Sequence, residues 1–425
     1  MIGRSRTLAT LAGATALSQG LVIIASPILT RLYAPSDFGI YAGAVSLVSI
    51  VTVVACLRYE QAIPLPEDSR TVASLIVLCL GLAAVSTLLL GIALVVAGDR
   101  VRAILGLRSM DELLVPILIG VVGGAWYSTL SGWATRVMAF GNLARTRVSQ
   151  AIGLMVLQVV FGVLGAGPTG LLFGDAVGRS AGTSSLARVL WSAESAMIRS
   201  VSVATVVAAA RRYRRFAFLS TPSAVLDIVA IQAPIWILLA LFGAPVAGWY
   251  LLASRVATAP NALAAASVGP VFLAETADLA RQDRSKLATT FAQAVRRLTL
   301  IGIAPCLLLM AVAPFAFPII FGEAWATAGI FAALLAPMFF TQLITSPVSG
   351  ILVVLERQDL HLAREFVSIA LLAVGYGIAV IGRLNEVATV LILSAAGTLS
   401  ALVYLAVMWA AVTKSASAKP GTETQ

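Results

Sequence analysis

The sequence is poor in charged residues. Asp, Glu, Lys and Arg make up only 11% of its 425 residues, whereas about 25% is usual in soluble domains. Hydrophobic residues make up 60%, and the mean hydropathy is +0.97. This composition excludes a soluble globular chain and predicts an all-α integral membrane protein that crosses the bilayer many times.

Histidine and cysteine are also scarce. The only histidine, His361, lies in the charged segment ERQDLHLARE, where we expect a solvated or interfacial residue. Cys56, Cys79 and Cys306 lie in apolar runs without the spacing of disulfides or metal sites. The sequence has no phosphate-binding loop with its lysine and no G-x-S-x-G turn. We therefore predict no metal, no cofactor and no enzyme activity.

Acidic residues are fewer than basic ones, which leaves a net charge of +10. A basic chain often binds nucleic acid, but membrane proteins also collect Lys and Arg on their cytoplasmic side. Nucleic acid is therefore the weaker interpretation, and we expect no such partner.

Twelve apolar segments are long enough to cross a bilayer. They lie at about 8–29, 38–57, 72–97, 113–134, 148–164, 169–190, 216–242, 246–274, 295–321, 326–355, 362–381 and 387–412. A polar interval, whose last five residues include four arginines, separates the sixth from the seventh. We therefore predict two six-helix bundles, 1–190 and 216–425, joined by a basic cytoplasmic linker at 191–215. The second bundle ends in a short polar tail.

The distribution of Lys and Arg predicts the orientation. With both termini in the cytoplasm, 22 of the 29 basic residues lie on the cytoplasmic side and 5 on the other side, and Arg179 and Arg255 lie within helices. This asymmetry agrees with the positive-inside rule. An odd number of helices would destroy the agreement.

The two halves contain an ungapped repeat at a constant offset of 209 residues. Leu29, Leu32, Tyr33, Gly39 and Tyr41 align with Leu238, Leu241, Phe242, Gly248 and Tyr250. Chance agreement is one explanation, because these residue types are common in apolar sequence. The other is two halves of similar design, related by an axis along the membrane normal.

Two arginines fall within predicted membrane helices, where a charge costs about 2.5–3.5 kcal/mol on insertion scales. Arg255 has no acidic neighbour in its own helix, and the next acid downstream is Glu275. Its charge therefore requires another helix, a hydrated cavity or a ligand. Arg179 follows Asp175 by four residues, so mutual neutralisation on one helix face and a functional role both stay open.

Acidic residues within the predicted helices are candidates for ion coupling. Asp227 lies between Pro222 and Pro234 in the seventh predicted helix, and interrupted helices often form transport sites. The alternative is a polar residue that bonds across the bundle. We take Asp227 and Asp175 as the two candidates.

Three motifs resemble a known family. They are LTRLYAPSDFGIY, RYEQAIPLP and GWYLLASRVATAP, which begin at Leu29, Arg58 and Gly248. Together they resemble the polysaccharide-biosynthesis, or Wzx-like, flippases of the multidrug/oligosaccharidyl-lipid/polysaccharide exporter superfamily.

The resemblance implies twelve or fourteen helices in two bundles around a central cavity. It also implies movement of a polyprenyl-diphosphate-linked oligosaccharide between the leaflets of a bacterial inner membrane. Cationic cavity residues of the family hold the anionic substrate. This implies a role for Arg255 first, then for Arg31 and Arg58, and only loosely for Arg179. The implied partners are membrane lipid, a polysaccharide polymerase and other assembly proteins.

Other functions stay open at this point. One is a related exporter of small cationic drugs or of the peptidoglycan lipid precursor, although a cationic cargo favours buried acids over arginines. A membrane-embedded glycan polymerase would need a large outer loop, and the longest predicted here covers only about 98–112. A scaffold for the polysaccharide machinery is a third alternative.

Overall fold

The computed structural model describes residues 2–97 and 111–417, which contain helices and no strand. In the first half of the chain the helices are α1 (Ile2–Leu32), α2 (Pro35–Ala55), η1 (Tyr59–Ala62), α3 (Ser69–Val96), α5 (Asp111–Arg136), α6 (Phe140–Val163), α7 (Gly167–Ser180), α8 (Thr183–Arg199) and α9 (Val203–Arg212). A π-helical turn, η2 (Phe216–Ser220), then leads into α10 (Thr221–Phe242) and α11 (Ala244–Ala257). The remaining helices are α12 (Ala259–Gln282), η3 (Arg284–Lys286), α13 (Leu287–Phe321), η4 (Glu323–Trp325), α14 (Ala326–Val348), α15 (Ile351–Val354), α16 (Gln358–Ile381) and α17 (Glu386–Ser417).

The number of membrane helices agrees with the sequence. Within the described residues, eleven helices are long and apolar enough to cross a membrane, and the count rises to twelve if α7–α8 and α9 form one bent span. Many large apolar side chains on these helices point outward, such as Val96, Ile319 and Ile381. An apolar exterior suits lipid contact, and the predicted all-α, multi-pass membrane protein is confirmed.

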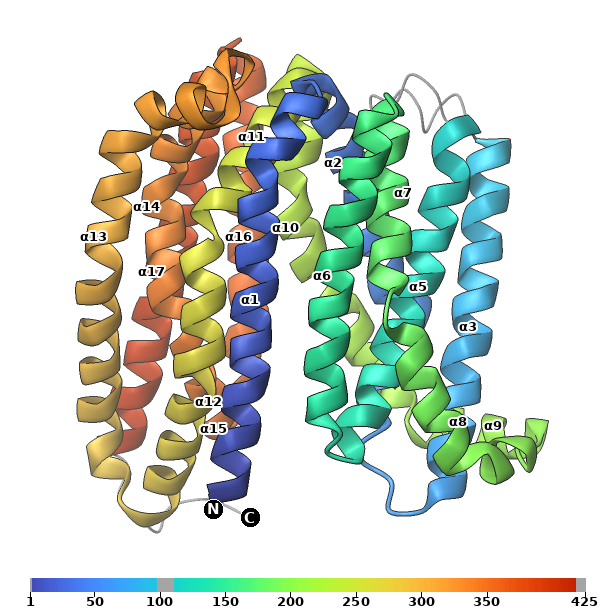
Figure 1. The fold of residues 1–425 in the computed structure, drawn as a ribbon. Coiled ribbons are helices and arrows are strands. Elements are labelled where there is room, and N and C mark those ends of the chain that lie inside the picture. The colour runs from blue at the N-terminus through green and yellow to red at the C-terminus, as the bar shows by residue number, and fades with distance from the viewer. Residues whose placement is uncertain (1, 98–110, 418–425) are drawn as a thin grey trace. The chain divides into compact units, whose positions relative to one another are not determined.

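The chain folds into two compact units, Met1–Leu251 and Leu252–Gln425. In the first unit, α7 packs against α5 and α6, α1 runs along α6, and α10 packs on α2 (Figure 1). In the second, α13 and α17 pack against α14, and α16 packs on α17. The predicted division at 191–215, and the predicted central cavity between two six-helix bundles, stay predictions.

The repeated glycines meet inside the first unit. A Cβ atom added to Gly39 would lie 1.8 Å from the carbonyl oxygen of Ala244, and one added to Gly248 would lie 1.9 Å from that of Pro35. Pro35 and Ala244 are themselves separated by the repeat offset. Gly39 therefore contacts Ala244, and their repeat counterparts, Gly248 and Pro35, make the same contact. Such a reciprocal contact is typical of two halves related by a two-fold axis. This supports a true repeat.

Two predicted helices are broken in the structure. The sixth, predicted as one segment over 169–190, divides into α7 and α8, because Gly182 adopts a left-handed conformation with a φ of 77°. The eighth, predicted over 246–274, divides into α11 and α12. Pro260 lies in the first turn of α12, where its missing N–H breaks no helical hydrogen bond.

The predicted linker at 191–215 is largely helical in the structure. Helix α8 continues to Arg199, and α9 begins after Ser202. Ser202 Oγ accepts a hydrogen bond from the Thr205 N–H, and Thr205 Oγ1 accepts one from the Ser202 N–H. This reciprocal cap starts the new helix, which is bent by 107° from α7–α8.

Candidate functional site

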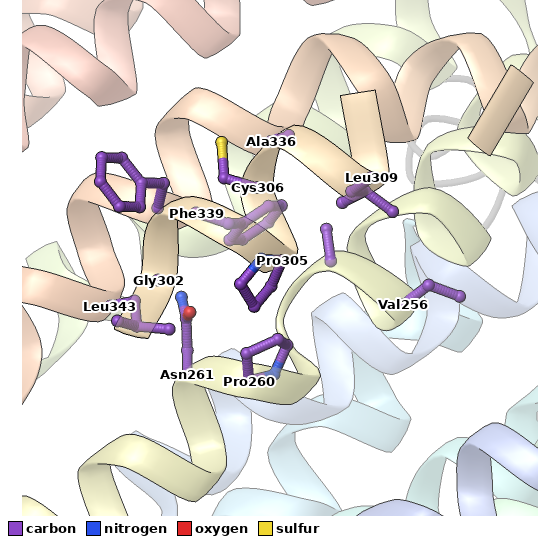
Figure 2. Close-up of a pocket in the computed structure, with 12 residues that line it drawn as sticks. Val256, Pro260, Asn261, Gly302, Pro305, Cys306, Leu309, Ala336, Phe339 and Leu343 are labelled. Atoms are coloured by element: carbon purple, nitrogen blue, oxygen red, sulfur yellow. The ribbon is translucent and has the colours of Figure 1, made fainter. Parts of the chain in front are cut away.

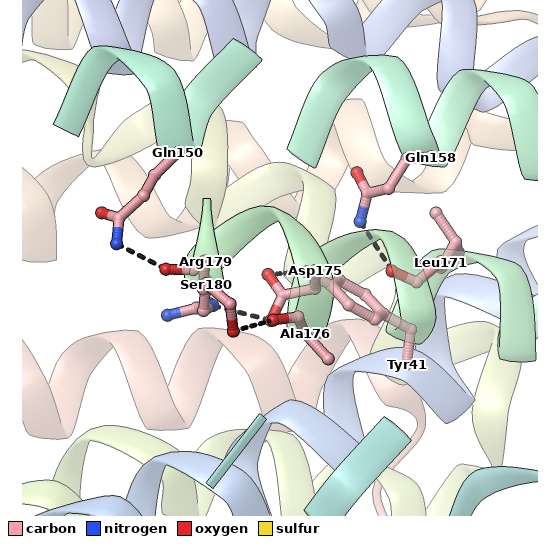
Figure 3. Close-up of polar contacts among 8 residues, drawn as sticks. All are labelled: Tyr41, Gln150, Gln158, Leu171, Asp175, Ala176, Arg179 and Ser180. Carbon is pink, nitrogen blue, oxygen red and sulfur yellow. Dashed lines mark hydrogen bonds and ion pairs between the residues drawn. The ribbon is translucent and has the colours of Figure 1, made fainter. Parts of the chain in front are cut away.

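The candidate site is centred on Asp175 of α7, and this residue is only 2% exposed. Its Oδ1 accepts a hydrogen bond of 3.0 Å from the Tyr41 hydroxyl on α2, and its Oδ2 accepts one of 2.7 Å from Arg179 Nε (Figure 3). The predicted pairing of Asp175 and Arg179 on one helix face is therefore confirmed. The third member, Tyr41, was not predicted.

Glutamine side chains of α6 hold α7 in place. Gln158 Nε2 donates to the Leu171 carbonyl at 2.9 Å, and Gln150 Nε2 donates to the Arg179 carbonyl. Close approach is possible because a Cβ atom at Gly178 would lie 2.4 Å from Leu154 Cα of α6. The backbone that carries Asp175 and Arg179 is thus fixed from α6, while Tyr41 fixes the carboxylate from α2.

Arg179 differs from Asp175 in its exposure. Its side chain is 48% exposed, although it is paired with a nearly buried carboxylate. Because the ion pair uses Nε, the donors on the two Nη atoms lie farther out along the side chain. A planar guanidinium held in this way has the geometry to bind an anionic oxygen pair.

Arg58 lies just beyond the end of α2, which has its C-cap at Cys56. It has a left-handed backbone with a φ of 60°, immediately before η1. Its Nη1 lies 3.6 Å from Glu60 Oε1, and the two side chains are 27% and 12% exposed. Burial raises the pKa of Glu60 above its ordinary value, while nearby Arg58 acts in the opposite direction. Arg31 is exposed in the last turn of α1.

Arg255 and Asp227 lie in different units. Arg255 is half-buried in the last turn of α11, directly before the break at Thr258. Asp227 is exposed on α10. Both residues interact with other groups of the chain. The predicted roles of both residues stay predictions.

A small pocket follows Arg255 in the second unit. It is lined by α12, α13 and α14 and by the end of α11, and has a volume of about 80 Å³ (Figure 2). Pro260, Pro305 and Phe339 make it mainly apolar, and Asn261 supplies an amide. This mainly apolar lining offers few of the hydrogen-bonding groups that an oligosaccharide needs.

Sequence reasoning missed a buried carboxylate. Glu365 on α16 is 1% exposed and forms an ion pair with Arg364. The Arg364 guanidinium lies 5.2 Å from the centre of the Tyr404 ring, and the Tyr404 hydroxyl lies 3.1 Å from His361 Nδ1. Glu365 falls within the predicted helix at 362–381, but nothing in the sequence marked it as buried; in the structure this helix, α16, begins at Gln358.

Comparisons with known proteins agree with this architecture. The chain is 27% identical over 334 residues to the succinoglycan biosynthesis transport protein ExoT of Rhizobium meliloti (strain 1021), which covers 75% of this chain but only 62% of that relative. The fold is similar to that of the lipid II flippase MurJ in an inward closed conformation, with a TM-score of 0.73, 14% identity, and coverage of 93% and 86% of the two chains.

It is also similar to an inward-facing multidrug resistance MATE family transporter of the MOP superfamily, with a TM-score of 0.61, 16% identity, and coverage of 96% and 95%. The model of one family, described as polysaccharide biosynthesis protein, matches residues 28–329. The chain, with its apolar helices and buried polar network, therefore belongs to the polysaccharide biosynthesis protein family.

Proposed function

We propose that this protein is a flippase that moves a polyprenyl-diphosphate-linked oligosaccharide across the bacterial inner membrane, for export of a surface polysaccharide. The observation that carries the proposal is that a member of the polysaccharide biosynthesis family has a fold similar to that of a lipid II flippase. The name of ExoT, a transport protein of succinoglycan biosynthesis, supports an exopolysaccharide as the product. The family match does not favour the small-molecule exporter or polymerase alternatives.

A flippase moves a charged diphosphate and its sugars across an apolar bilayer without making or breaking a covalent bond. Each unpaired charge in a bilayer costs several kcal/mol, so a diphosphate needs a polar path. The lipid tail needs none and stays in the bilayer. Alternating access provides such a path, because a polar cavity opens first to one side of the membrane and then to the other.

The proposed contacts to the anionic head are Arg255, Arg31, Arg58 and Arg179. The half-exposed Arg179 has the clearest geometric support, since it pairs with Asp175, which also accepts a hydrogen bond from Tyr41. For ion coupling, Asp175 and Asp227 are the proposed carboxylates, and the burial of Glu365 adds a third. The proposed orientation, with both termini cytoplasmic, is supported by the 22-to-5 distribution of basic residues. A polymerase and other assembly proteins are proposed partners.

Reconstitution tests the proposed activity. In proteoliposomes that contain polyprenyl-diphosphate-linked oligosaccharide in both leaflets, an impermeant glycosidase should cleave the inner-leaflet pool only when the protein is present. Protein-free vesicles are the control, together with a phospholipid that carries the same sugar label. Equal cleavage with and without active protein would refute the flippase.

Replacing Arg255 should show whether transport needs only a positive charge at this position or also the planar guanidinium group. We expect Arg255→Ala to lose nearly all transport and Arg255→Lys to keep part of it. The reason is that an ammonium retains the charge but lacks the planar paired donors that suit a diphosphate. The measurement is surface polysaccharide in a strain without its native flippase, at equal protein abundance. Arg281→Ala, at an exposed arginine of α12, is the control. Full production from Arg255→Ala would make Arg255 a structural residue.

A further inference from the structure

Helix α9 lies at the end of the first unit where α3 begins, and packs on α3 (Figure 1). Its inner face is fixed at two points. Ala209 is 4% exposed, and the Ala210 carbonyl accepts a hydrogen bond of 3.1 Å from the Tyr59 hydroxyl of η1. The helix is therefore held against the protein along one side and in a defined direction.

The outer face of α9 is apolar although no part of the described chain covers it. Val203 is 81% exposed and Val207 is 41% exposed, and Ala204 and Ala208 are exposed between and beside them. Residues three and four apart share a helix face, so these four side chains form one strip. Phe218, in the turn that follows, is 73% exposed. Helix α9 is also bent by 107° from α7–α8. An exposed apolar strip on such a helix is typical of helices that lie in a membrane interface.

The same helix ends in concentrated positive charge. Arg211, Arg212, Arg214 and Arg215 are all exposed. A nearby acid is Asp68, whose pKa is lowered first by the hydrogen bond from the Thr71 N–H and also by the charge of Arg212. Residues 191–215 contain five arginines and one acid, Glu194, so positive charge is in excess next to the apolar strip.

We propose that α9 is an interfacial helix that binds anionic phospholipid. The strip from Val203 to Ala208 lies among the upper acyl chains, and the four arginines bind the phosphate groups of headgroups around it. The pairing of an uncovered apolar face with unbalanced cationic charge favours a lipid surface of negative charge over a protein or a zwitterionic lipid. The proposal does not depend on which cargo the protein moves.

Fluorescence quenching by brominated lipid tests this proposal without a transport assay. The full chain with Cys306→Ala and Val207→Cys is labelled with bimane; Cys56 and Cys79 are buried and do not react. The protein is reconstituted in mixed phosphatidylglycerol and phosphatidylcholine vesicles in which one lipid is brominated. We expect quenching to be about twofold or more stronger with brominated phosphatidylglycerol. A label at Leu88→Cys, on the exposed side of α3, should be quenched equally by both lipids.

Removing the positive charge of the four arginines should abolish the preference for phosphatidylglycerol. Changing Arg211, Arg212, Arg214 and Arg215 together to Gln should make quenching at position 207 equal for the two lipids. In the chain that keeps all four arginines, about 0.5 M salt should have the same effect through screening. The proposal is overturned if neither brominated lipid quenches the label at position 207, or if both quench it equally in the chain that keeps the four arginines. It is also overturned if the preference for phosphatidylglycerol survives both the Gln substitutions and the added salt.

Discussion

Replacing Gly39 or Gly248 by alanine is expected to prevent correct folding. The added Cβ would lie 1.8 Å or 1.9 Å from a backbone carbonyl oxygen of the facing helix, and a backbone atom has no rotamer that relieves the overlap. The two helices must separate, which removes close contacts on both sides of a reciprocal crossing. Overpacking usually costs about 1–3 kcal/mol and occasionally more, and we expect the upper end or beyond here.

The measurement is the melting temperature and the yield of monodisperse protein in detergent. Gly377→Ala in α16 is the matched control, because a Cβ atom there meets no atom within 4 Å. It should be neutral or slightly stabilising, since alanine favours a helix over glycine by about 1 kcal/mol. A melting temperature of Gly39→Ala equal to that of Gly377→Ala would contradict the close crossing.

Variants of Asp175 and Arg179 should distinguish substrate binding from simple ion pairing. Arg179→Gln leaves the buried Asp175 carboxylate with Tyr41 alone, and we expect a lower melting temperature and little transport. Removing one partner of a buried pair costs about 3–5 kcal/mol. The loss should be smaller here because the Arg179 side chain is 48% exposed.

The decisive variant combines Asp175→Asn with Arg179→Gln. It removes both charges, so the melting temperature should recover, while transport in proteoliposomes should stay reduced by about tenfold or more if the guanidinium binds the anionic head. The exposed pair Asp278 and Arg281, changed in the same way, should alter neither quantity. Wild-type transport by the neutral double variant would show that the pair serves only the fold.

The polar network shows where sequence reasoning succeeds and where it ends. The pairing of Asp175 with Arg179 was predictable because four residues in a helix bring two side chains to one face. Tyr41, the partner of the same carboxylate, is 134 residues away in sequence. Its contribution depends on how α2 packs beside α7, and no local pattern reports that.

Burial in a membrane protein is especially hard to predict from hydropathy. In water, an apolar stripe marks the face that packs inward, but in lipid the outward face is apolar as well. The sequence therefore placed Glu365 in a predicted helix, at 362–381, without showing which way it faces, and only the structure shows that this carboxylate is 1% exposed. For the same reason the sequence did not show that the predicted linker at 191–215 contains α9, a capped helix that packs on α3.

The sequence by itself determined that the protein lies in a membrane and crosses it about a dozen times, and it suggested a repeat. These depend on composition, on the length of apolar runs and on register, which are properties of the chain alone. The tertiary structure decided that Gly39 and Gly248 form a reciprocal crossing, that Tyr41 completes the Asp175 site, and that α9 presents an uncovered apolar face. Each of these is a contact, or the lack of one, between segments distant in sequence, and only packing fixes which segments meet.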